Sequence, residues 1–266
     1  MPGRASFAFF ILSLALCAST FGASTQAFAE PLSSVGRAAE NAKGKSKTPP
    51  KAKGAQSIGA PNQGRLSGGM RLRPSKHMQI RQNARTWGTP ELVKMIKRAA
   101  GLVARKHRGS KLFVGDMSAK RGGPIEGHNS HQSGRDVDIA FYVANSKGDS
   151  VHPKRFVAFD SAGHGRTLTW ARFDEARNWT LVEALLSDEH ANVRYLFISN
   201  ALKARLLAYA SKKKVPAELI ARAAGAMVSP AGADVHDDHF HVRIACPPAS
   251  LAVCAEESNV REQEGP

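Results

Sequence analysis

Two short stretches rich in histidine and aspartate decide how this chain folds and what it can bind. The first is HNSHQSGRDVD, from His128 to Asp138, and the second, much later in the chain, is HDDHFHV, from His236 to Val242. Five of the ten histidines fall in these stretches, with carboxylates beside them. Imidazole nitrogens and a carboxylate oxygen are typical ligands of Zn²⁺, and three protein ligands with one open position are typical of a catalytic zinc site. The two stretches therefore predict a hydrolytic metalloenzyme.

The first stretch predicts a strand with a loop in front of it. Polar and apolar residues largely alternate after Asp136, so Asp136 and Asp138 are expected on one face of a half-buried strand, with the apolar residues between them in the core. His131 precedes this strand by a turn that contains Gly134, and this turn lets the imidazole fold back over Asp138. His128 is expected to approach the same cleft.

The second stretch alternates in the same way. His239, His241 and Arg243 are expected on one face of a strand whose apolar residues anchor it in the core. If the two strands pair, His131, Asp138 and His241 converge on one ion. His239, about 7 Å along the same face, would stand beside the open coordination position, where a general base belongs. A lone strand histidine is usually only packed or solvated, but the clustering of ligand types disfavours a purely structural explanation.

The N-terminus predicts a secretory signal peptide over residues 1–29. A basic residue precedes the apolar run Phe7–Ala18, and Ala27–Ala29 has the small-x-small pattern of a cleavage site before Glu30. The apolar run is too short to span a bilayer, so no membrane span is expected. A lipoprotein would use Cys17, but the bulky Leu16 stands where a small residue is required. We expect an exported protein, periplasmic or secreted.

Residues 30–63 have the composition of a flexible basic linker. The stretch is rich in Ala, Gly, Ser, Pro and Lys and has almost no large apolar side chains. Such a composition buries too little surface to offset the entropy lost on ordering. The remaining residues, 64–266, are enough for one hydrophobic core, so we expect a single catalytic domain there.

The chain is strongly basic, with 38 Lys and Arg against 22 Asp and Glu and a net charge of +16. A basic exported protein suits an anionic polymer of the cell wall, which the linker would contact. Nucleic acid is the other polyanion that such a charge fits. Export disfavours nucleic acid, and the sequence has no zinc-finger spacing or aromatic-rich basic motif.

Two cysteines remain after the signal peptide, Cys246 and Cys254, at the ends of CPPASLAVC. In an oxidising compartment such a close pair is most simply a disulfide that closes a short loop. A metal-binding role is the less simple alternative, because no second cysteine pair exists. The disulfide is expected to pin the segment just beyond His241.

Mixed helix and strand patterns without regular alternation predict an α+β fold, in which a small antiparallel sheet carries the zinc site and is flanked by helices and long loops. Thr89 is typical of a helix N-cap, and apolar residues at helical spacing predict a helix from Pro90 to Lys106. The other predicted elements are strands at Lys111–Gly115 and Val193–Ser199 and helices at Trp179–Leu186 and Ala201–Ala210.

The two histidine stretches also carry a family resemblance. GHNSHQSGRDVDI (Gly127–Ile139) and HFHVRIACP (His239–Pro247) resemble the signatures of the penicillin-insensitive murein endopeptidases, relatives of lysostaphin, the D-Ala-D-Ala peptidases and the hedgehog amino-terminal domain. The likeness begins near Gln56 and covers most of the chain after the linker. Shorter similar strings are SIG at Ser57–Gly59, RTWGTPELV at Arg85–Val93, VGDMS at Val114–Ser118 and RYLFISNALK at Arg194–Lys203.

The resemblance implies roles for these residues. His131, Asp138 and His241 match the zinc ligands, His239 matches the catalytic histidine, and His236 matches a further active-site histidine. The implied reaction is hydrolysis of peptide cross-links in peptidoglycan, typically the D-alanyl to meso-diaminopimelyl bond, by zinc-activated water and without a serine acyl-enzyme.

The resemblance offers a second metal set as well. It would consist of His128 with Asp160 and His164, although the last two are spaced more widely than the family pattern requires.

Two other functions remain open at this point. A zinc D,D- or L,D-carboxypeptidase of the same superfamily typically has Glu-x-x-His or Glu-x-Trp-His on its last strand, where this chain has His239-Phe240-His241. A non-catalytic envelope-binding module would keep zinc for structure alone. Such a module needs no spare base, so the presence of His236 and His239 favours the endopeptidase.

Overall fold

The computed structural model describes residues 54–229 and 236–256. The expected signal peptide and most of the expected linker lie outside the described residues, as do residues 230–235. Within the described part, no helix is long and apolar enough to cross a membrane. The helices are α1 (Pro90–Lys106), α2 (Glu175–Leu186), α3 (Asn200–Lys212) and α4 (Ala217–Ala226), and a short 3-10 helix, η1, covers Pro248–Ser250.

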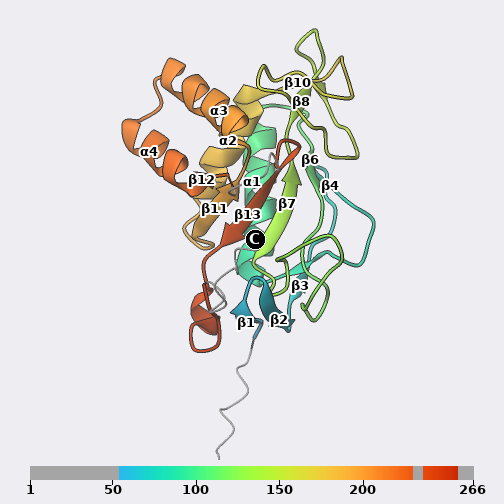
Figure 1. Ribbon diagram of the computed structural model, residues 1–266, viewed down its shortest axis with the longest axis vertical. Coiled ribbons are helices and arrows are strands. Elements are labelled where there is room, and N and C mark those ends of the chain that lie inside the picture. Colours follow the sequence, from blue (N-terminus) through green and yellow to red (C-terminus); the bar gives the residue numbers. More distant parts are fainter. Residues whose placement is uncertain (1–53, 230–235, 257–266) are drawn as a thin grey trace, which may run out of the picture. The chain divides into compact units, whose positions relative to one another are not determined.

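Short strands make up the rest of the regular structure, and the α+β prediction is confirmed (Figure 1). They are β1 (Gln56–Ala60), β2 (Gln63–Ser67), β3 (Met70–Arg71), β4 (Met78–Ile80), β5 (Trp87–Gly88), β6 (Leu112–Val114), β7 (Asp136–Ala140), β8 (Val143–Ala144), β9 (Ser150–Val151), β10 (Arg172–Phe173), β11 (Val193–Phe197), β12 (Met227–Val228) and β13 (His239–Ile244).

A six-stranded sheet in the order β12-β11-β13-β7-β6-β4 positions the two histidine stretches. Its centre is antiparallel, because β13 runs opposite to both β11 and β7, while the outer pairs β11–β12 and β4–β6 are parallel. In the β13–β7 register His241 lies opposite Asp138, and Arg243 lies opposite Asp136. The strand pairing assumed from the sequence is therefore present.

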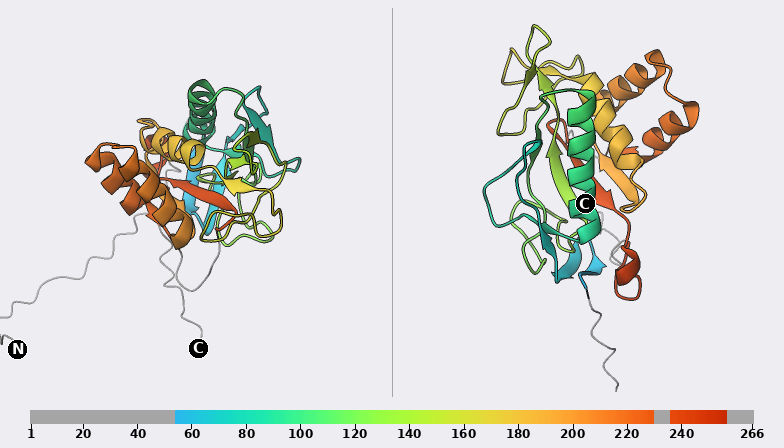
Figure 2. Two further views of the ribbon diagram at one scale, coloured as in Figure 1. Left: turned by 90° about the horizontal axis from the view of Figure 1, so that it is seen from above. Right: turned by 180° about the vertical axis from the view of Figure 1, so that it is seen from behind.

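Helix α1 packs against one face of the central strands (Figure 1 and Figure 2). It has the predicted bounds: Pro90 is its first residue, and the Thr89 side chain accepts a hydrogen bond from the Leu92 N–H. Its buried side joins one apolar cluster with Val137, Ile139 and other inward residues of β7 and β13. Burial of this face leaves the polar side chains of the same strands on the opposite face.

Strand β7 is more buried than expected. The sequence predicts a half-buried strand, yet Asp136 and Asp138 are as inaccessible as the apolar residues between them, with relative exposures of 0% and 1%. The side chains of His131, His241 and Arg243 lie against these carboxylates, which a two-residue alternation does not reveal. These carboxylates therefore act in a medium of low dielectric constant, where charges interact more strongly than in water.

The folded domain also begins earlier than expected. The hairpin of β1 and β2 lies partly inside residues 30–63, so the predicted linker is too long at its C-terminal end. Backbone hydrogen bonds hold this hairpin to the C-terminal segment: the Gly59 N–H donates to Val253 O at 2.8 Å, and the Ala255 N–H donates to Gly59 O at 3.1 Å. Composition does not indicate such pairing, because any residue except proline can supply it.

The C-terminal segment is fixed by a disulfide and a buried arginine. Cys246 and Cys254 form the expected disulfide. The fully buried Arg135 donates hydrogen bonds to Ile244 O at 3.1 Å and Ala255 O at 2.5 Å, and it forms an ion pair with Glu256 at 2.9 Å. Glu256 also accepts the Cys246 N–H at 2.8 Å. The end of β13 is therefore held by both covalent and polar contacts.

Replacing Cys246 and Cys254 by serine should lower the free energy of unfolding by about 2–3 kcal/mol, because the open loop gains conformational entropy in the unfolded chain. Urea titrations in oxidising buffer measure this loss. Reductant should lower the wild-type midpoint to that of the double variant and leave the variant unchanged. Identical midpoints for the two proteins under oxidising conditions would contradict this account of the loop.

Candidate metal centre

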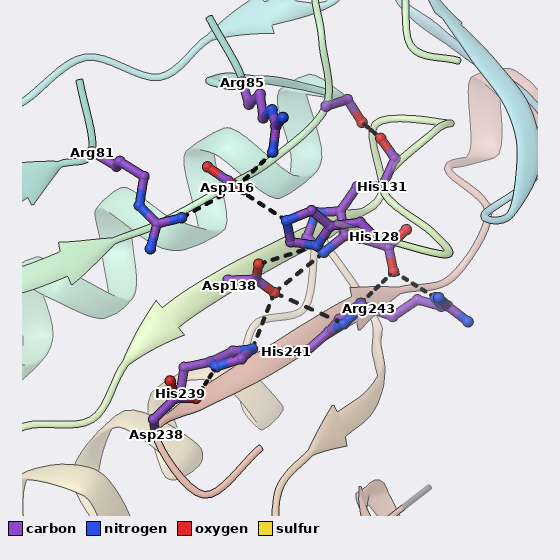
Figure 3. Close-up of polar contacts among 12 residues, drawn as sticks. Arg81, Arg85, Asp116, His128, His131, Asp138, Asp238, His239, His241 and Arg243 are labelled. Atoms are coloured by element: carbon purple, nitrogen blue, oxygen red, sulfur yellow. Dashed lines mark hydrogen bonds and ion pairs between the residues drawn. The ribbon is translucent and has the colours of Figure 1, made fainter. Parts of the chain in front are cut away.

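Three side chains predicted as metal ligands meet on the polar face of β7 and β13 (Figure 3). His131 Nε2 lies 3.2 Å from Asp138 Oδ1, and His241 Nδ1 lies 3.8 Å from the same oxygen. The rings of His131 and His241 are 4.6 Å apart, centroid to centroid. The structure thus brings together the three residues that the sequence predicts to converge.

The atoms at the centre of this group lack hydrogen-bond partners. Both ring nitrogens of His131 and the Oδ1 atom of Asp138 are buried, and among the described residues none of them makes a hydrogen bond of good geometry: the 3.2 Å contact between His131 Nε2 and Asp138 Oδ1 is an ion pair. Buried polar atoms without a partner are rare because each costs free energy. A cation held between these atoms would offset that cost, and imidazole with carboxylate is the donor set that zinc prefers. The residues present therefore fit a zinc ion.

The carboxylate of the group is held in its charged form. Burial alone would raise the pKa of Asp138, but the interactions with His131, His239 and His241 together outweigh burial and hold the pKa well below its usual range. Burial lowers the pKa of His241, whereas Asp138 outweighs burial at His131 and raises its pKa. A metal binds an ionised carboxylate and neutral imidazoles, so binding at His131 displaces a proton.

A short turn places His131 over the strand. His131 has a positive φ of 66°, and its carbonyl accepts a 2.5 Å hydrogen bond from Ser118 Oγ. The same hydroxyl oxygen accepts the Gly134 N–H at 2.8 Å. Gly134 itself has a φ of 79°, and a Cβ there would meet the Leu66 side chain at 2.7 Å, so only glycine fits this position.

Asp136 contacts the ring nitrogen of His241 that points away from Asp138. Asp136 Oδ1 lies 2.8 Å from His241 Nε2 and accepts a 2.6 Å hydrogen bond from Arg243 Nε. Burial would raise the pKa of Asp136, but the charge of Arg243 and the contact with His241 hold it well below its usual range. With Nε2 engaged in this way, the Nδ1 atom of His241 is left facing Asp138. A carboxylate behind a ligating histidine fixes the tautomer and the ring orientation.

His128 lies on the other side of Asp138. Its Nδ1 atom is 3.7 Å from Asp138 Oδ2, and its ring packs against that of His131 with centroids 4.4 Å apart. Among the described residues, the group whose ligand atoms all lie within 4.8 Å of one another consists of His128, His131 and Asp138, and it could hold an ion; His241 is not part of this group. His131 and Asp138 are common to both candidate triplets.

A buried carboxylate that the sequence did not single out as a site residue holds His128. Asp116 Oδ2 lies 3.0 Å from His128 Nε2 and 3.2 Å from both Arg81 Nη1 and Arg85 Nη1 (Figure 3). Burial would raise the pKa of Asp116, but these contacts and a hydrogen bond from Asn83 lower it to about 2. The only signal in the sequence is the string VGDMS, which carries the family likeness but no ligand pattern.

His239 stands beside the group, as predicted. Its Nδ1 atom is 2.5 Å from Asp238 Oδ1, and its Nε2 atom is 3.5 Å from Asp138 Oδ1. Burial lowers the pKa of His239, but the two carboxylates outweigh it and raise the pKa to about 9. The Phe156 ring stacks on the imidazole at 4.6 Å and 17°. A Cβ on Gly115 would meet this phenyl ring at 2.3 Å, so glycine makes room for it.

His236 completes the histidine cluster. Its ring centroid is 5.1 Å from that of His239 and 5.7 Å from that of His241. Burial and the two neighbouring histidines lower the pKa of His236 to about 4, so its imidazole is neutral at pH 7. Its Nδ1 atom is buried without a hydrogen-bond partner, which leaves it available to a bound molecule.

Comparison with known proteins identifies the family of this chain. The sequence profile of the penicillin-insensitive murein endopeptidases matches residues 57–266. The chain belongs to the penicillin-insensitive murein endopeptidase family. Its relatives of that name include proteins from Escherichia coli O139:H28 (strain E24377A / ETEC) and Shigella boydii serotype 18 (strain CDC 3083-94 / BS512). Each is 29% identical over 206 residues, which is 74% of this chain and 69% of the relative.

Membership of the penicillin-insensitive murein endopeptidase family identifies the chain as a peptidase. Three side chains that the sequence patterns did not single out also contact the histidines of the two stretches. Asp116, Asp238 and Phe156 lie outside the alternating positions of the two motif strands, and each of them contacts a motif histidine.

The second metal set that the resemblance offers is not assembled among the described residues. Asp160 and His164 form an exposed pair, 3.9 Å apart and more than two-fifths accessible on each side chain. Among the described residues, the group of potential ligands around His128 contains His131 and Asp138 and neither of this pair. The Asp160 carboxylate has a local structural role instead: it accepts a hydrogen bond from the backbone N–H of His164 at 2.8 Å and so closes a surface turn.

Asp136→Asn should raise the dissociation constant for zinc about 10–100-fold, because His241 loses the carboxylate that orients it. Competition with a chelator of known affinity measures the change, and circular dichroism checks the fold. Asp160→Asn is the matched control and should bind zinc as the wild type does. Wild-type affinity in Asp136→Asn would refute the orienting role, and weaker binding in Asp160→Asn would reinstate the second metal set.

Proposed function

We propose that the chain is a zinc-dependent endopeptidase that hydrolyses peptide cross-links of peptidoglycan, at the bond between a D-alanyl residue and a meso-diaminopimelyl residue. The observation that carries this proposal is the meeting of His131, Asp138 and His241 with His239 beside them. A purely structural site would need no such neighbour. The names of the relatives, murein endopeptidases, supply the substrate class.

His131, Asp138 and His241 are the proposed zinc ligands. When bound, zinc polarises a carbonyl and lowers the pKa of a water ligand to about 7. Asp136 keeps the Nδ1 atom of His241 directed at the centre, and the turn at Ser118 keeps His131 in place. The burial of Asp136 and Asp138 keeps bulk water away from both carboxylates, which strengthens their charge interactions.

His239 is the proposed general base and acid. Because the pKa of His239 is raised to about 9, its imidazole is protonated at pH 7, with the Nδ1–H donating to Asp238. Nε2 must therefore lose its own proton first; it is then proposed to take a proton from the attacking water and return it to the leaving amine. Phe156 fixes the plane of the ring by stacking on it. Because the pKa of His236 is about 4, its imidazole stays neutral, and it is proposed to donate a hydrogen bond to a substrate oxygen.

The proposed place of action is the cell wall. Peptidoglycan lies outside the cytoplasm, so this substrate agrees with the signal peptide predicted at residues 1–29. The basic residues of the predicted linker are proposed to attract the anionic wall polymer by long-range charge interactions, which salt weakens.

Zinc removal should abolish cleavage of cross-linked muropeptide dimers, and added zinc should restore it. His131→Ala, Asp138→Ala and His241→Ala should each lose the metal, as elemental analysis of purified protein would reveal. Chromatography of the products separates the alternatives, because an endopeptidase releases monomers whereas a carboxypeptidase releases single D-alanine residues. Full zinc content in all three variants would refute the ligand assignment.

His239→Ala should keep zinc and fold but lose about 10²–10⁴-fold in kcat, the usual contribution of a general acid–base group. Asp238→Asn should lose less, because the amide still contacts the ring but no longer stabilises its charge. Single-turnover cleavage of dimers measures both variants. A near wild-type rate in His239→Ala would make this residue a bystander.

A further inference from the structure

A cavity of about 810 Å³ lies next to the metal centre, and neither the proposed ligands nor the proposed base lines it. Its deepest lining is apolar and comes from the buried side chains of Leu72, Met78 and Phe113. Every charged residue in its lining is basic: these are Arg71, Arg81 and Lys154. The cavity thus combines an apolar floor with a cationic rim.

Arg81 connects this cavity to the centre. Its guanidinium carbon lies 4.8 Å from the centre of the Phe156 ring, and the imidazole of His239 stacks on the same ring at 4.6 Å. Arg81 also shares Asp116 with His128 (Figure 3). One lining residue of the cavity, Arg81, is therefore linked through Phe156 to His239.

The positive charge of the rim is only partly balanced. Asp116 pairs with Arg81, whereas Arg71 makes a hydrogen bond to the neutral hydroxyl of Thr86 at 3.4 Å. In the part of the chain that the structure describes, neither Arg71 nor Lys154 forms an ion pair with a carboxylate. The rim is therefore suited to an anionic group. The cavity therefore offers complementary contacts to a carboxylate and to an aliphatic chain.

We propose that this cavity binds the carboxylate-bearing arm of the substrate that carries the leaving amine, with Arg71 and Lys154 as its specificity-determining residues. The inference rests on the proposed function. In the proposed bond the scissile nitrogen belongs to a diaminopimelyl residue, which has a carboxylate on the adjoining carbon, a short aliphatic chain and a second carboxyl carbon. The apolar floor fits the chain, and the cations of the rim fit the carboxylate.

Calorimetry with the zinc-loaded protein tests the proposal without turnover. The probes are a tripeptide that ends in meso-diaminopimelate and the same peptide with its carboxylates converted to carboxamides. The double variant Arg71→Gln/Lys154→Gln should bind the acidic peptide about tenfold more weakly than the wild type, as expected for two exposed ion pairs. The affinity of the wild type for the carboxamide peptide should be lower by a similar factor.

The control is the double variant Lys94→Gln/Lys97→Gln, which makes the same change of charge on the exposed side of α1. It should bind the acidic peptide as the wild type does.

Equal affinity of the wild type for the acidic and carboxamide peptides would overturn the proposal. An equal loss of affinity for the acidic peptide in the two double variants would also overturn it, because the lower affinity would then come from the reduced net charge of the protein. Parallel assays of dimer cleavage separate this failure from failure of the proposed reaction. Peptide binding that depends on Arg71 and Lys154 without any cleavage refutes the reaction alone, and normal cleavage with unchanged KM and binding in that variant refutes the cavity alone.

Discussion

The site depends on the antiparallel pairing of β7 with β13, which sets His241 directly opposite Asp138 inside the protein. A slip of one residue in this register would turn every polar side chain of one strand into the apolar core. Burial of the apolar face against α1 prevents such a slip, because Val137 and Ile139 fill the space on that side. The packing of the core therefore determines which donor atoms meet at the centre.

Three carboxylates lose their solvation in this site, which costs free energy. Different contacts offset the cost for each carboxylate. Asp116 contacts two arginines and His128, and Asp136 contacts Arg243 and His241. Asp138 contacts four histidines: His128, His131, His239 and His241. In Asp116 and Asp136 the arginines offset the loss of solvation. Asp138 has no such arginine partner, which makes it the carboxylate that most requires a cation.

Much of the site could be predicted from the sequence, because the strand period of two fixes which residues share a face. It places Asp136 with Asp138, and His239 with His241, without further knowledge. The contacts from distant loops could not be predicted in this way, since Asp116 and Phe156 reach the histidines only through the fold. The start of α2 at Glu175 depends on a cap by Asp174, and the hairpin of β1 and β2 depends on backbone pairing with the C-terminal segment. Neither has a hydrophobic pattern that marks it.

The central claim is that one zinc ion lies between His131, Asp138 and His241. Anomalous diffraction at the zinc absorption edge, from crystals of the zinc-loaded protein, tests this claim most directly because it locates the ion itself. We expect one strong peak whose nearest protein atoms are a ring nitrogen of His131, a carboxylate oxygen of Asp138 and the Nδ1 atom of His241. A peak coordinated by His128 in place of His241, or one at the surface beside Asp160 and His164, would contradict it.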